Sequence, residues 1–162
     1  MKDFTRNNIH LYLALAAGCL LLIAITLLAP NGSAAETSVV GMAPLSVVEV
    51  TVSPSTVLED GTQNLVYTIR RTGSISGPIV VNYSVSGTAT PGNDYTGVGA
   101  SGGWLAFVPE QTELRLFVDP TADSKVEPVE SVVITLHPGP GCLVGPKYLA
   151  TGRIANDDLS WP

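Results

Sequence analysis

Two hydrophobic patterns divide this chain near residue 30. The first is an apolar run over residues 11–29, LYLALAAGCLLLIAITLLA, which contains no charged residue. As a helix rising about 1.5 Å per residue, this run matches the thickness of a bilayer's hydrocarbon core. Beyond it, apolar and polar residues alternate in short stretches, and no later segment keeps a 3.6-residue period. The first pattern therefore predicts a transmembrane or signal helix, and the second predicts strands.

Seven alternating stretches follow one another after the apolar run. In one of them, Ile79, Val81, Tyr83 and Val85 share a face. Turns with Gly and Pro separate the stretches, which are rich in the strand-favouring residues Val and Thr. We therefore predict an all-β, seven-stranded antiparallel sandwich. Its predicted strands are residues 46–52, 64–70, 78–85, 104–108, 113–118, 130–136 and 147–155.

These patterns divide the chain into five consecutive parts. Lys2 and Arg6 precede the apolar run, whereas the next basic residue is Arg70. This asymmetry predicts an N-terminus on the cytoplasmic side and a domain on the periplasmic or extracellular side. The parts are a cytoplasmic N-terminus (1–10), a transmembrane helix (11–29), a linker (30–45), a sandwich (46–158) and a C-terminal tail (159–162).

The fate of the apolar run is open at this stage. Its length favours a retained single-pass anchor, because a signal peptide usually has a shorter apolar core. Residues 33–35, Ser-Ala-Ala, nevertheless offer a small-residue cleavage site, and cleavage near Ala35 would release a secreted domain. Lipidation at Cys19 is a third alternative, although apolar residues continue beyond that cysteine.

The charge distribution excludes one class of partner and suggests another. The net charge is −6, and all but Asp3 of the fourteen acidic residues lie after the apolar run. No basic stripe suited to nucleic acid is present. Clustered carboxylates attract cations, and several loops that meet at one end of an up-and-down sandwich could hold Ca²⁺. The alternative is that the acids simply lie in solvated loops.

The residues needed for most catalytic chemistry are missing from the predicted domain. His10 and His137 lie on opposite sides of the apolar run, and Cys19 lies inside that run, far from Cys142. The Gly-rich stretch 97–103 precedes no helix, so we interpret it as a flexible loop instead of a phosphate cradle. We predict a non-enzyme without a small-molecule substrate or a required cofactor. Cys142 is either a free thiol or an intermolecular partner.

Six stretches together resemble a Calx-beta domain. They are Leu58–Gly61, Gly87–Tyr95 (GTATPGNDY), Phe107–Pro109, Asp123 with Glu127–Glu130 (EPVE), Ile134–Leu136 and Ile154–Asp158. The resemblance implies an immunoglobulin-like sandwich. Regulatory domains of sodium–calcium exchangers in this family bind Ca²⁺ at one end, and bacterial surface proteins use the domain in adhesion. Carried over by position, the candidate Ca²⁺ ligands are Glu59, Asp94, Asp123, Glu127, Glu130, Asp157 and Asp158.

Three departures from the family's pattern affect this expectation. Ala122 stands where strong binders often have an Asp, and Asn156 replaces the first acid of a terminal triplet. Both changes predict weaker Ca²⁺ binding, because affinity follows the number of charged ligands. Glu110 occupies a turn position that is often Gly, which affects the loop and not the metal ligands.

Two functions are expected from these features. The first is a non-catalytic, membrane-anchored accessory subunit, held through residues 11–29, whose domain docks on other protein subunits of a membrane complex at its outer face. Candidate contact points are Trp104, Trp161 and the apolar loop 142–149, although Trp104 also suits the core. The alternative is a Ca²⁺-responsive cell-surface or adhesion module.

Overall fold

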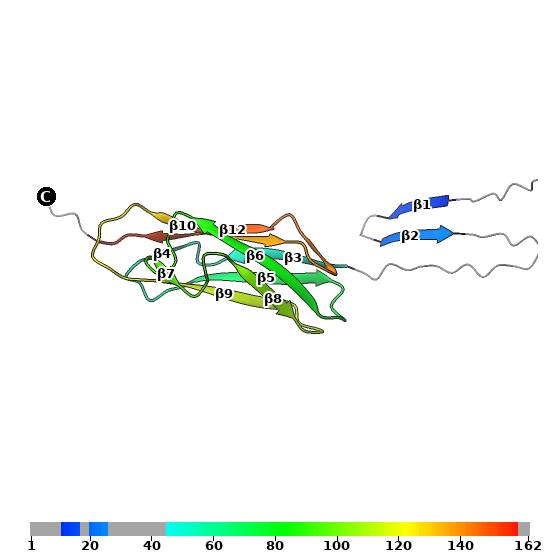
Figure 1. Ribbon diagram of the computed structural model, residues 1–162, viewed down its shortest axis with the longest axis horizontal. Coiled ribbons are helices and arrows are strands. Elements are labelled where there is room, and N and C mark those ends of the chain that lie inside the picture. Colours follow the sequence, from blue (N-terminus) through cyan, green and yellow to red (C-terminus); the bar gives the residue numbers. More distant parts are fainter. Residues whose placement is uncertain (1–10, 17–19, 26–44, 159–162) are drawn as a thin grey trace, which may run out of the picture. The chain divides into compact units, whose positions relative to one another are not determined.

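A computed structural model describes residues 11–16, 20–25 and 45–158, which divide into two units at Pro44 (Figure 1). In the first unit, β1 (Leu11–Ala16) pairs antiparallel with β2 (Leu20–Ile25). These residues were predicted to be helical; a uniformly apolar run has no periodicity that separates a buried helix from a strand. In the described part of the chain, no helix is long and apolar enough to cross a membrane. Residues 17–19 and 26–29 lie outside the described part, and the predicted anchor stays a prediction.

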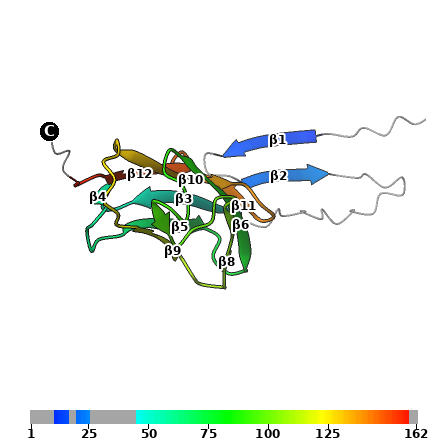
Figure 2. The same cartoon turned by 60° about the vertical axis from the view of Figure 1, so that its left-hand side comes forward.

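The second unit contains two five-stranded sheets (Figures 1 and 2). Sheet I contains, in spatial order, β4 (Thr56–Leu58), β12 (Leu149–Ala155), β10 (Glu130–His137), β6 (Ile79–Gly87) and β8 (Gly103–Phe107). Sheet II contains β11 (Cys142–Val144), β3 (Ser46–Val52), β5 (Leu65–Gly73), β9 (Glu113–Pro120) and β7 (Tyr95–Thr96). The predicted all-β sandwich is therefore confirmed. All seven predicted strands are present, and the short strands β4, β7 and β11 add to them.

The order of strands differs from the up-and-down arrangement assumed from the sequence. In sheet I, β10 pairs with β6 from Val132 opposite Gly87 to His137 opposite Asn82. In sheet II, β5 pairs with β9, so the chain crosses between the sheets after β5 and again before β9. Hydrophobic alternation places residues on a face, but it carries no information about which strands pair.

The core of the sandwich is made of alternate residues on the inward faces of both sheets. Val48 and Val50 of β3, Tyr67 of β5 and Ile134 of β10 are at most 1% exposed. The buried core cluster extends from Val48 to Ile154, so it lies entirely within the second unit. A unit with its own core and both sheets has what a domain needs to fold alone.

Trp104 is not part of this core, in contrast to its suggested inward position. Along β8, Phe107 is fully buried and Leu105 packs against the core, while Trp104 is 68% exposed. Successive residues of a strand point to opposite faces, and the two inward positions of β8 are already taken. The tryptophan consequently projects from the outer face of sheet I.

Candidate metal centre

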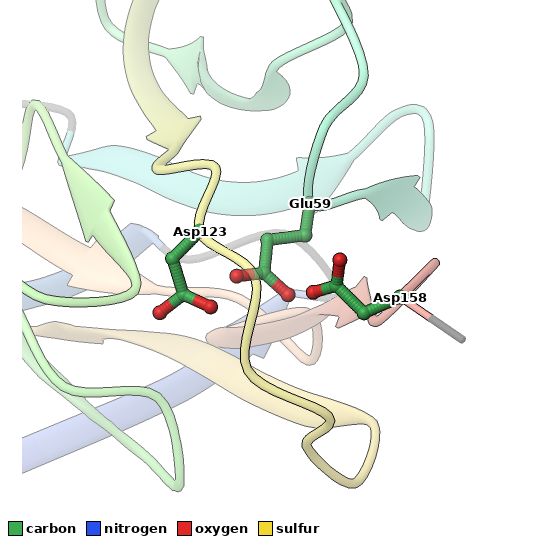
Figure 3. Close-up of side chains that lie close together, drawn as sticks. All are labelled: Glu59, Asp123 and Asp158. Carbon is green, nitrogen blue, oxygen red and sulfur yellow. The ribbon is translucent and has the colours of Figure 1, made fainter. Parts of the chain in front are cut away.

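The first group of carboxylates joins three segments that are far apart in the sequence. Glu59 directly follows β4, and its amide donates to the carbonyl of Ala155 (3.0 Å), at the end of β12. Asp158 lies three residues beyond β12, and Asp123 lies between β9 and β10. Carboxylate oxygens of Glu59, Asp123 and Asp158 lie within 4.8 Å of one another (Figure 3). Parallel pairing of β4 with β12 brings Glu59 and Asp158 together.

The second group contains Asp94, Glu127 and Glu130. Asp94 lies just before β7, and Glu130 is the first residue of β10. The carboxylate of Asp94 accepts a hydrogen bond from the amide of Thr90 (2.5 Å), which fixes its place in the turn. One oxygen from each of the three carboxylates again lies within 4.8 Å of the others. The loop that joins β9 to β10 thus contributes to both groups, through Asp123 and Glu127.

This spacing fits a divalent cation. Ca²⁺ lies about 2.3–2.6 Å from its oxygen ligands, so two ligands of one ion are at most about 5 Å apart. Both groups satisfy that limit. Glu59 adds a second indication, because it is only 5% exposed and no base pairs with it among the described residues. A buried carboxylate without a positive partner is costly unless a cation neutralises it.

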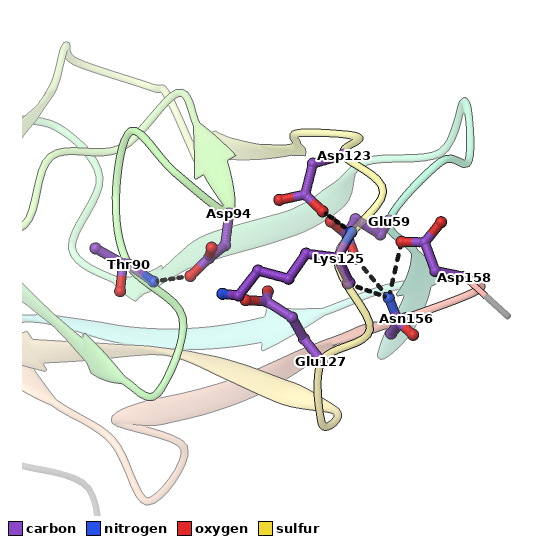
Figure 4. A network of polar contacts seen from close by, with 8 residues as sticks. All are labelled: Glu59, Thr90, Asp94, Asp123, Lys125, Glu127, Asn156 and Asp158. Atoms are coloured by element: carbon purple, nitrogen blue, oxygen red, sulfur yellow. Dashed lines mark hydrogen bonds and ion pairs between the residues drawn. The ribbon is translucent and has the colours of Figure 1, made fainter. Parts of the chain in front are cut away.

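Asn156 holds the first group together. Its Nδ2 donates to Glu59 Oε2 (3.2 Å), to Asp158 Oδ2 (3.1 Å) and to the carbonyl of Lys125 (3.0 Å) (Figure 4). The sequence suggested only that this asparagine removes a ligand charge. In the structure its amide protons also reduce the repulsion between two carboxylates, which is part of what a cation would do.

Lys125 is a residue of this end of the domain that the sequence analysis missed. Its ammonium forms an ion pair with Oε1 of Glu127, and its amide donates to Asp123 Oδ1 (2.6 Å). Figure 4 shows the lysine side chain extending toward Asp94 and Glu127. Lys125 is the only base among the residues that connect β9 to β10, which was a signal available in the sequence. The second group therefore contains a positive charge supplied by the chain itself.

Glu130 titrates far from the ordinary range of a glutamate. Burial, a hydrogen bond with Asp94 and the charge of Asp94 raise its pKa from 4.5 to about 7. The nearby ammonium of Lys125 lowers the pKa of Glu130, and the charge of Glu59 raises it. Close carboxylates cannot all ionise without a compensating charge, so Glu130 retains a proton that a metal would displace.

Two further acids lie at this end but outside both groups. Asp157 is exposed, and its Oδ1 accepts a hydrogen bond from the amide of Asp60 (3.2 Å). Desolvation and the charges of Asp157, Asp158 and Asp123 raise the pKa of the exposed Asp60. Of the seven predicted ligands, the structure thus brings six into two groups and leaves Asp157 in a supporting contact. Asp60 was not among the predicted ligands and contributes charge.

One serine–histidine pair lies away from the acidic loops. Ser84 Oγ is 2.9 Å from Nε2 of His137, and both side chains are on β6 and β10 of sheet I. The contact is exposed, and among the described residues no carboxylate hydrogen-bonds to His137. A nucleophile of this kind needs a base that a third group orients, and no such group contacts His137 among the described residues.

Comparison with known proteins agrees with this geometry. The model of the Calx-beta domain family matches residues 45–154, which is more than half of the chain. No curated protein matches the chain. Among solved structures, the apo-form Calx CBD1 domain is similar with 27% identity and a TM-score of 0.58, over 70% of this chain and 99% of that one.

Two longer solved structures are also similar. One is CBD12 of CALX1.2 (28% identity, TM-score 0.57), and the other is described as the calcium binding domain CBD12 of CALX1.1 (29% identity, TM-score 0.56). Each match covers 68% of this chain, which spans less than half (45%) of those two structures. The sheets, the acidic loops and the match over residues 45–154 together show that this chain belongs to the Calx-beta domain family.

Proposed function

We propose that residues 45–158 form a non-catalytic Ca²⁺-binding module. The observation that carries this proposal is the pair of carboxylate groups, Glu59–Asp123–Asp158 and Asp94–Glu127–Glu130, each with oxygens close enough to share one ion. Similarity to a structure described as a calcium binding domain supports it. Of the two functions expected from the sequence, the Ca²⁺-responsive module is the one that the site favours.

The affinity of this module is expected to be modest. Asn156 and Lys125 already neutralise part of the negative charge, and Ala122 supplies no ligand. Fewer charged ligands weaken Ca²⁺ binding, so we expect a dissociation constant on the order of 10⁻⁴–10⁻³ M, as in extracellular modules. Such a module responds to the Ca²⁺ concentration outside the cell and not to the much lower Ca²⁺ concentration of the cytosol.

A thermal-unfolding titration of residues 45–162 tests this function. Ligand at about ten times its dissociation constant stabilises a protein by about 1.4 kcal/mol. Millimolar Ca²⁺ should therefore raise the melting temperature, and a chelator should reverse the rise. Glu59→Gln should reduce the Ca²⁺ effect by removing the contribution of the first group, whereas Glu110→Gln, a change at an exposed acid outside both groups, should leave the effect unchanged. An unchanged melting temperature and no heat of binding in calorimetry would exclude the module.

The membrane-anchored accessory role, in which the domain docks on partner proteins, stays a prediction. It depends on residues 11–29 as the anchor and on other subunits as partners. Membrane fractionation of the full chain, followed by purification in mild detergent, tests both requirements. Recovery from the soluble fraction, or purification without companion subunits, would contradict this role and leave the Ca²⁺ proposal unaffected.

A further inference from the structure

The β8 strand is an uncovered edge of sheet I. It pairs with β6 on one side, from Gly103 opposite Tyr83 to Phe107 opposite Ile79. Among the described residues, no other backbone hydrogen bond involves Gly103–Phe107, so the outward amides and carbonyls of β8 are unpaired. Figures 1 and 2 both show β8 at the border of the sandwich.

This edge lacks the features that usually prevent a strand from pairing with another chain. The sequence GWLAF contains no charged residue and no Pro, and its strand has no bulge in the register with β6. Natural edges are commonly protected by Lys, Pro or bulges. In a chain with a net charge of −6, an uncharged edge is a place where two copies can approach without direct repulsion.

The outer face beside this edge presents several exposed apolar side chains, although Asn82 of β6 lies opposite Trp104. Trp104 is 68% exposed, Val108 is 60% exposed and Val80 is 42% exposed. Ala106 is exposed between them and lies directly opposite Val80 of β6. The side chain of Ala106 is much smaller than that of Trp104, so it projects less from this face.

We propose that β8 pairs with the β8 strand of a second copy of this chain. In an antiparallel pair centred on Leu105, each Leu105 lies opposite its counterpart, and each Trp104 lies opposite the second copy's Ala106. Sheet I of both copies then forms one continuous sheet around a twofold axis.

This register matches large side chains with small ones. Within each copy, Ala106 lies opposite Val80 on the neighbouring strand. In the proposed pair, Trp104 of one copy therefore lies in line with Ala106 and Val80 of the second copy. Its ring covers the second copy's Ala106 and reaches the second copy's Val80, and the symmetric contact forms on the other side of the axis. The twofold symmetry buries both tryptophans, and the strands gain the hydrogen bonds that β8 lacks. No charged side chain enters the interface.

Oxidative cross-linking of the full chain tests this register. Directly opposed residues of an antiparallel pair have Cα atoms about 4.5–5.5 Å apart, a separation at which a disulfide forms. In a Cys19→Ser background, Leu105→Cys should give covalent dimers in mild detergent. Thr51→Cys, at an exposed position on sheet II, should give no covalent dimer and serves as the matched control. Adding Ala106→Glu should suppress the Leu105→Cys cross-link, because two carboxylates enter the interface.

Sedimentation of residues 45–162 provides a measurement that does not depend on the cysteine variant or the apolar run. The unmodified domain should show a monomer–dimer equilibrium, and Trp104→Ala should weaken association at least tenfold while retaining a cooperative unfolding transition. Thr51→Lys should not change association. A domain that is monomeric at all concentrations, or cross-linking of Leu105→Cys that equals the Thr51→Cys control, would overturn the proposal.

Discussion

The hydroxyl of Tyr67 and the backbone amide of Gly152 form a buried hydrogen bond (3.0 Å) that connects sheet II to sheet I. The same hydroxyl donates to the carbonyl of Val132 (2.6 Å), so it joins β5 to both β10 and β12. Burial is the largest cause that raises the pKa of Tyr67 to about 12. Because β10 and β12 lead directly to Glu130 and Asp158, this contact fixes the strands that carry two of the candidate ligands.

Replacing the tyrosine hydroxyl tests the strength of this connection. Tyr67→Phe leaves the amide of Gly152 and the carbonyl of Val132 without that partner inside the core. An unsatisfied buried polar group costs about 1–3 kcal/mol, and we expect a loss of that size in urea unfolding of residues 45–162. Tyr148→Phe, at a 46% exposed position, should change stability by less than about 0.5 kcal/mol. Equal effects of the two substitutions would contradict this explanation.

Gly152 is required because there is no room for a side chain. A Cβ at this position would lie 2.6 Å from the Tyr67 hydroxyl oxygen and 2.7 Å from Cδ1 of Leu65. Gly152→Ala should therefore cost about 1–3 kcal/mol through overpacking, measured by chemical denaturation. Gly99→Ala, where a Cβ meets nothing within 4 Å, should be nearly neutral. In the Tyr67→Phe background, the cost of Gly152→Ala should fall, because one of the clashing atoms is gone.

The raised pKa of Glu130 makes the metal-free domain sensitive to pH. Between pH 4.5 and about pH 7, Glu130 retains a proton in the folded protein that it releases in the unfolded chain. Since the folded state binds more protons, stability should fall as pH rises through this interval and level off above it. Urea unfolding in chelator at unit steps from about pH 5 to about pH 8 measures the slope, and Glu130→Gln should reduce it. A slope unchanged by that substitution would show that another group is responsible.

The same proton links metal binding to pH. Ca²⁺ must displace it from the Asp94–Glu130 pair, so the apparent affinity for Ca²⁺ should increase as pH rises through about 7. Calorimetry in two buffers with different ionisation enthalpies should detect proton release near neutral pH and less release for Glu130→Gln. Binding without proton release would place the metal away from Glu130.

Lys125 should oppose metal binding at the second group. Lys125→Gln removes the ammonium that pairs with Glu127. The free energy of unfolding of the metal-free domain should fall by less than about 1 kcal/mol at neutral pH, because exposed ion pairs contribute little. Stabilisation by Ca²⁺ should become larger, because the metal no longer faces a competing positive charge. Lys147→Gln, at an exposed lysine on the chain before β12, serves as the charge-matched control. A weaker response to Ca²⁺ in Lys125→Gln would show that the lysine supports the site.

Glu110 has an unfavourable backbone conformation that glycine would relieve. Its φ is 65°, in the left-handed region, and its amide donates to the carbonyl of Ile75 (2.8 Å). Left-handed geometry costs a residue with a Cβ about 1–2 kcal/mol, and glycine avoids this cost. Glycine also makes the unfolded chain more flexible, which offsets part of the gain in stability. Glu110→Gly should therefore stabilise the domain by up to about 1 kcal/mol in thermal unfolding. Glu110→Ala retains the Cβ and should give no such gain.

The alternating residues by themselves determined the strands and the sandwich. In β3, β5 and β6, apolar residues recur at every second position, and that period is a local property of the chain. The acidic loops could also be located, because Glu59 precedes a predicted strand, and Asp123 and Asp158 follow strand ends that the pattern marks. The secondary structure of residues 11–29 could not be determined in this way, since a run in which almost every position is apolar has no period.

Only the tertiary structure decided how these local elements meet. The parallel pairing of β4 with β12 places Glu59 beside Asp158, and the crossing of the chain between sheets brings Asp94 to Glu130. Lys125 and Asn156 acquire their roles through contacts with residues far away in the sequence, which no local pattern encodes. The outward position of Trp104 depends on which residues of β8 the core accepts. Strands come from local periodicity, whereas sites come from the long-range pairing that packing selects.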